Sequence, residues 1–161
     1  MATRFGRKSV LSVREQSARM RIDFTDFKTR VEGPWLVSQG DVHPSPMSAS
    51  YRVEIRYAVG KPPEVRVLSP PLTCREGATK IPHMYGQERL CLFFPGSGEW
   101  SADLPLGRTF LPWIALWLYY YELWHATGEW LGGGLEPVLD KESLKNDREQ
   151  QAYTRHGKQT H

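Results

Sequence analysis

The chain has 161 residues, of which 40% are hydrophobic and 24% charged, and its formal net charge is +3 at pH 7. These values predict one folded domain with a core of its own and exclude wholesale disorder. Two cysteines are too few for a secreted disulfide framework or for a zinc site built on cysteine alone. Residues 1–10 lack the apolar segment of a signal peptide, and the longest apolar run, residues 110–121, is shorter than the ~18–20 residues of a membrane span. We therefore expect a cytoplasmic protein that does not contact a membrane.

The first predicted element is a helix over residues 9–23. Ser12 and Glu15 have the spacing of a capping box, and an apolar face recurs at intervals of three and four residues. The members of that face are Val10, Val13, Ser17, Met20 and Phe24. Residues 1–30 hold eight Lys or Arg against three Asp or Glu. That charge suits a solvated helix face or, as the alternative, contact with an acidic partner or nucleic acid.

Four strands are predicted after the helix, because hydrophobic residues then recur with period two. The clearest strand alternates Tyr51, Val53, Ile55, Tyr57 and Val59 with polar residues. The predicted strands cover residues 27–31, 35–42, 51–59 and 64–68. Strands so close in sequence favour an antiparallel meander with one buried face.

Residues 69–109 show little regular pattern and are rich in proline and glycine, which is typical of a functional loop. A helix is predicted from about Thr109 to His125, with Pro112 near its first turn and Thr127-Gly128 closing it. Its two adjacent apolar stripes indicate a core helix. The order of elements predicts an α+β domain over residues 1–134, followed by a polar tail, residues 135–161, that is a marginal helix or disordered.

Cys91 is the candidate reactive residue. His83 precedes it by eight residues across a polar turn, which can fold back and bring imidazole and thiol together. His83 and Arg89 would supply positive potential that favours the thiolate. The alternative is an inert thiol packed in an apolar run. We interpret Cys74 as an incidental exposed thiol, and we expect no metal site and no cofactor, because metal-ligand spacings and phosphate-binding glycine motifs are missing.

Several motifs resemble the ubiquitin-conjugating, or E2, family in its prokaryotic branch. Residues 62–68 read Pro-Pro-Glu-Val-Arg-Val-Leu, like the family's proline-led strand. His83-Met84-Tyr85 stands where the family has His-Pro-Asn, ahead of Cys91-Leu92, and Trp100-Ser101 follows the cysteine. Residues 112–130 resemble the aromatic helix of bacterial members. The resemblance implies a UBC-like fold and a stand-alone E2-like protein of CBASS, the cyclic-oligonucleotide anti-phage defence.

The resemblance also implies a chemistry and its residues. Cys91 would carry a protein C-terminus, that of a cGAS-like nucleotidyltransferase, as a thioester and pass it to the lysine of an acceptor protein. His83 would shape the loop, and Tyr85 would replace the family's Asn as the hydrogen-bond donor to the oxyanion. The acceptor lysine would approach past three further residues, Glu99, Ser101 and Asp103.

Two other functions are alternatives to this one. A catalytically inactive E2-like module would bind the nucleotidyltransferase through the same surface and would not need Cys91. A nucleic-acid binder would use the basic residues 1–30 and show salt-dependent affinity, but recognised nucleic-acid motifs do not accompany that charge.

Overall fold

The computed structural model of the protein describes residues 9–134. In chain order its elements are α1 (Val13–Asp23), β1 (Lys28–Glu32), β2 (Trp35–Val42), β3 (Tyr51–Tyr57), β4 (Glu64–Ser69), β5 (Met84–Tyr85), β6 (Arg89–Leu90) and α2 (Leu106–Thr127). This is the α+β arrangement that the sequence predicts, with a UBC-like order of elements. The predicted tail, residues 135–161, lies outside the described residues, and the domain boundary at residue 134 stays a prediction.

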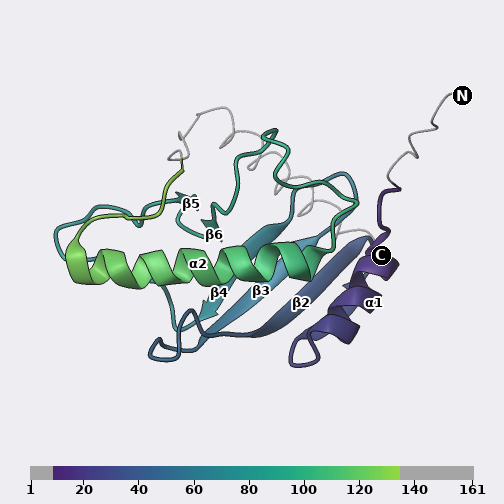
Figure 1. The fold of residues 1–161 in the computed structure, drawn as a ribbon, viewed down its shortest axis with the longest axis horizontal. Helices are drawn as coiled ribbons and strands as arrows, with labels where there is room; N and C mark the ends of the chain where they lie inside the picture. Colours follow the sequence, from purple (N-terminus) through teal and green to yellow (C-terminus); the bar gives the residue numbers. More distant parts are fainter. Residues whose placement is uncertain (1–8, 135–161) are drawn as a thin grey trace, which may run out of the picture.

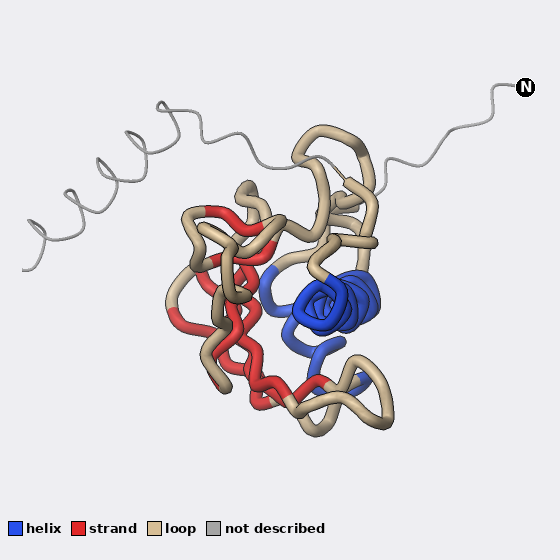
Figure 2. Tube along the Cα trace, turned by 90° about the vertical axis from the view of Figure 1, so that its left-hand side faces the viewer, coloured by secondary structure: helices blue, strands red, loops and turns tan. Residues whose placement is uncertain are grey.

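Strands β1 to β4 form one antiparallel meander in the order β1-β2-β3-β4. Helices α1 and α2 lie on the same side of this sheet, and α2 runs across it (Figures 1 and 2). The inward residues of β3 are buried as predicted, except that the strand ends at Tyr57. Val59 lies in the following turn and is 53% exposed, so its predicted place on the buried face is wrong.

Helix α1 begins four residues later than the sequence predicts. The backbone N–H of Leu11 donates to the carbonyl oxygen of Ala102 at 2.9 Å, which ties this residue to another segment instead of a helical turn. Ser12 is extended and caps the helix, and Glu15 completes the predicted capping box. Val10 is therefore outside the helix and 55% exposed, whereas Gln16 is fully buried.

Helix α2 begins three residues earlier than predicted and ends two residues later, at Thr127, directly before the predicted Gly128 cap. Pro105 is the N-cap, so Pro112 lies inside the helix and not in its first turn. Gly128 closes the helix in the left-handed conformation, with φ of 86°, which glycine adopts without strain. Within residues 9–134, neither helix combines the length and apolarity that crossing a membrane requires.

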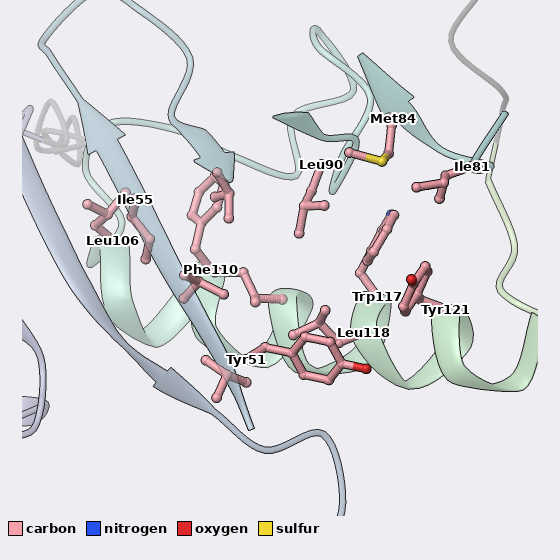
Figure 3. Packing of buried hydrophobic residues seen from close by; sticks show 14 of the residues in the cluster. Tyr51, Ile55, Ile81, Met84, Leu90, Leu106, Phe110, Trp117, Leu118 and Tyr121 are labelled. Carbon is pink, nitrogen blue, oxygen red and sulfur yellow. The ribbon is translucent and has the colours of Figure 1, made fainter. Parts of the chain in front are cut away.

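The core lies between α2, the sheet and part of the long loop. Leu106, Ile114 and Leu118 are fully buried on the sheet-facing side of α2. Figure 3 shows Ile81, Met84 and Leu90 on the loop side of the same helix, next to Trp117. The segment that holds Cys91 is thus fixed by hydrophobic residues on either side of it.

Candidate active site around Cys91

The residues before Cys91 form a small hairpin inside the segment for which the sequence predicts little regular structure. Met84 pairs with Leu90, and Tyr85 pairs with Arg89. The Gln87 side chain accepts from the backbone N–H of Ile81 at 2.7 Å and donates to its carbonyl at 3.0 Å. Two-residue strands are too short to show alternation, which is why the hairpin has no signal in the sequence.

The hairpin brings His83 and Cys91 together, as the fold-back of the polar turn predicts. The contact runs through the backbone, because the Cys91 N–H donates to the His83 carbonyl oxygen at 2.9 Å. The indole N–H of Trp117, on α2, donates to the same oxygen at 3.0 Å. His83 adopts a positive φ of 51°, a left-handed conformation that is uncommon outside glycine. One carbonyl therefore joins the cysteine to the core helix.

The His83 side chain is buried and faces an aromatic residue. The residue is 7% exposed, and the centroid of its ring lies 5.0 Å from that of the Trp130 ring. Trp130 also contacts Trp117, with 5.4 Å between centroids. This environment agrees with the predicted role of His83, which is to shape the loop.

Tyr85 is the polar side chain that meets the thiol. Burial raises the pKa of Tyr85 well above its usual value of 10, and a hydrogen bond with the Cys91 side chain raises it further. Arg89, whose guanidinium lies 5.9 Å from the centre of the Tyr85 ring, opposes this shift. The phenol is therefore protonated at neutral pH and is a hydrogen-bond donor beside the sulfur. The Cys91 Sγ also lies 4.0 Å from the carbonyl oxygen of Phe93.

Two cavities flank Cys91. The aromatic cavity, of about 200 Å³, has Cys91 itself in its wall, together with His83, Leu92, Trp117, Trp130 and Gly133. The proline-lined cavity, of about 330 Å³, lies toward the β3–β4 turn and has Tyr85 and Leu92 in its wall. Leu92 thus separates the two cavities, and the thiol is half-buried beside them.

The three residues predicted to receive the lysine lie apart from both cavities. Glu99 accepts from the Phe94 backbone N–H at 3.3 Å and from the Ser97 hydroxyl at 2.7 Å, which closes a turn after Cys91. The Ser101 hydroxyl donates to the Asp103 carboxylate. Their role toward an acceptor lysine stays a prediction.

The family model described as "Type II CBASS E2 protein" matches residues 16–137. The chain belongs to this family. No curated protein matches the chain. Membership establishes an E2-like role in CBASS, as the sequence motifs predict, and the match includes every residue of the hairpin and of both cavities.

Sequence reasoning missed several residues at this CBASS E2 site. Gly132 and Gly133 line the aromatic cavity, and the sequence motifs do not include them. A Cβ on Gly132 would come within 2.7 Å of the Tyr120 ring, so glycine is required there. Trp130, a large apolar residue beside these glycines, is the feature of the sequence that could have indicated that this segment packs against the site.

Cys74 is exposed and free, and it lines neither cavity. Among residues 9–134, no group of three His, Cys, Asp or Glu side chains is placed to hold a metal ion.

Proposed function

We propose that this CBASS E2 protein is an acyltransferase that carries a protein C-terminus as a thioester on Cys91. The supporting observation is the position of the thiol, which is half-buried in the wall of a cavity and hydrogen-bonded to the protonated Tyr85. Catalytic thiols occupy such partly exposed polar surroundings, whereas inert thiols are packed in apolar ones.

The reaction has two steps at the same sulfur. The Cys91 thiolate attacks the carbonyl carbon of an activated C-terminal carboxyl group, a C–S bond forms, and the activating group leaves. An amine of the acceptor, a lysine side chain, then attacks the thioester, the C–S bond breaks, and an amide forms as the amine loses its proton. Negative charge develops on the carbonyl oxygen in both steps, and the Tyr85 hydroxyl is the proposed donor to it.

The donor that we propose is the C-terminus of the cGAS-like nucleotidyltransferase of the same defence system. A chain that is held as a thioester and then joined to an amine would change the state of that enzyme and so regulate the anti-phage signal. We also propose that the protein acts in the reducing cytoplasm, since Cys74 and Cys91 form no disulfide bond with each other.

The test is to trap the adduct. The nucleotidyltransferase is supplied with its C-terminal carboxyl group already activated as a thioester, mixed with the protein and separated on non-reducing gels, with and without hydroxylamine, which cleaves thioesters. We expect a hydroxylamine-sensitive adduct that Cys91→Ala abolishes and the matched control Cys74→Ala retains.

Two results would contradict the proposal. An adduct that survives in Cys91→Ala and disappears in Cys74→Ala would show that Cys74, and not Cys91, carries the thioester. A stable complex with no covalent adduct, unchanged by Cys91→Ala, would show a catalytically inactive binding module. A separate measurement tests the nucleic-acid hypothesis. Affinity for nucleic acid that falls with rising salt and depends on the basic residues 1–30 would support it.

A further inference from the structure

The proline-lined cavity lies next to Tyr85 and Leu92, and the proposed reaction does not use it. Its volume is about 330 Å³, at the lower end of the ~300–1,000 Å³ typical of ligand pockets. Four segments form it: the β3–β4 turn with the start of β4, the β5–β6 hairpin, the residues that follow Cys91, and α2. Its apolar wall includes Pro62, Pro63, Leu92, Phe93, Pro95 and Phe110.

The charged groups in this cavity compensate one another. An Arg89 Nη1 lies 2.8 Å from a Glu64 carboxylate oxygen, and less than a third of either side chain is exposed. The same guanidinium lies over the Tyr85 ring. On the opposite wall Phe93 packs edge-on against Phe110, with centroids 5.7 Å apart. The cavity is therefore preformed and offers mainly apolar surface to an occupant.

The cavity adjoins the reactive centre at Tyr85 and Leu92. Tyr85 lines it with its ring while its hydroxyl bonds to the Cys91 side chain, and Leu92 directly follows the cysteine. A peptide linked to the sulfur advances ~3.3–3.6 Å per residue when extended. Side chains within the last few residues before the thioester carbonyl can therefore reach this cavity.

We propose that the proline-lined cavity binds one large apolar side chain from the last three residues of the C-terminus carried on Cys91. This inference rests on the proposed function and adds a substrate class to it: chains that end in a segment with a leucine-, methionine- or phenylalanine-like residue at one fixed position. An acceptor lysine fits this cavity poorly, because its ammonium group would lose water among apolar walls without a carboxylate of its own.

The experiment uses synthetic tetrapeptide benzyl thioesters as donors. Each is built on alanine and carries Phe, Leu, Gly or Asp at one of its last three positions. The Cys91 thiolate attacks the thioester carbonyl, the peptidyl–Cys91 bond forms, and benzyl thiol leaves. Adduct formation is followed by intact mass. At one position we expect Phe and Leu to react at least about 10-fold faster than Gly and Asp, the size of effect that burying such a side chain produces.

Two variants fill the cavity from exposed positions, Pro62→Trp and Pro95→Trp. Either should abolish the preference for Phe and Leu, while alkylation of Cys91 by iodoacetamide stays within about twofold of the wild-type rate. The matched control is Val59→Trp, which adds the same side chain to the β3–β4 turn at a position outside the cavity. This control should keep the preference.

Each contrary result has a distinct meaning. Equal rates for all side chains at all three positions overturn the inference and leave the thioester chemistry intact. A preference that survives in both tryptophan variants assigns the selectivity to another site and also overturns the inference.

An effect of these variants on the full-length nucleotidyltransferase but on none of the peptides would overturn it too, because the cavity would then bind a surface of that partner far from its C-terminus. If no peptide forms an adduct while iodoacetamide labels Cys91, the proposed function itself fails and the inference fails with it.

Discussion

Tyr85 occupies the position at which the E2 resemblance leads one to expect asparagine, and its surroundings give it similar hydrogen-bonding ability. Its pKa is raised by burial and by the neighbouring Cys91 side chain, so it keeps its proton across the physiological range. A protonated phenol can donate to the sulfur before reaction and to a developing oxyanion during it. The alternative is that the Tyr85 ring only anchors the loop.

Replacing Tyr85 by phenylalanine separates these two roles. Loss of one oxyanion donor typically costs about 100- to 1,000-fold in rate, so single-turnover discharge of the Cys91 thioester to an amine should slow by that factor with folding unchanged. Because the pKa of Tyr85 is raised, the ratio of the wild-type discharge rate to that of Tyr85→Phe should stay constant from pH 7 to pH 10. The ratio should fall only at higher pH, where the hydroxyl loses its proton.

The matched control for this change is Tyr57→Phe. The Tyr57 hydroxyl is buried and has no hydrogen-bond partner among the described residues, so its removal should leave the discharge rate unaltered. A wild-type discharge rate in Tyr85→Phe, together with an unstable Tyr85→Ala protein, would establish the anchor role instead.

At the scale of elements, local signals predict the fold well and long-range contacts explain the differences. Strand β2 has its predicted bounds, and the Gly128 cap ends α2 where the sequence indicates. The start of α2 is displaced because its first free N–H, that of Leu106, is satisfied by the distant Gln16 side chain at 2.8 Å. No window of local sequence contains that contact.

Trp117 connects the core of α2 to the candidate site. Its side chain is 5% exposed and its indole N–H bonds to His83, so Trp117→Ala should lower the free energy of unfolding by ~3–5 kcal/mol. Urea denaturation measures this change. The exposed Leu116→Ala, one residue away on the same helix, should stay within ~0.5 kcal/mol of wild type. A Trp117→Ala protein as stable as wild type would mean that α2 is not the core helix.

Across the whole molecule, a buried polar side chain joins α1 to the start of α2. The Gln16 amide donates to the Leu104 carbonyl and accepts from the Leu106 N–H, both at 2.8 Å. An exposed ion pair between Arg108 and Asp23 joins the same two helices. A polar residue on the buried side of α1 was invisible to a search for apolar periodicity. The proximity of Cys91, His83 and Tyr85 is predictable from their motif, whereas their catalytic roles stay predictions.

Gln16→Met tests this connection between the helices. Methionine keeps the approximate shape but leaves two buried backbone groups without partners, at ~1–3 kcal/mol each, so we expect a clear fall in the urea midpoint. Arg14→Met, at an exposed position on α1, is the control and should change stability by less than ~0.5 kcal/mol. Equal midpoints for the two variants would show that the Gln16 hydrogen bonds are dispensable.

The cysteine is held through the backbone of His83, and this has a consequence for which residues position 83 tolerates. The carbonyl that accepts from both Cys91 and Trp117 does not depend on the imidazole, whereas the φ of 51° restricts the residue type. In a saturation library at position 83, selection for a folded, iodoacetamide-reactive protein should therefore recover asparagine, aspartate and glycine beside histidine and deplete valine and isoleucine. Selection for activity would also require what the imidazole ring contributes through its contact with Trp130. Comparing the residues recovered under the two selections would therefore separate the backbone role of His83 from that of its side chain.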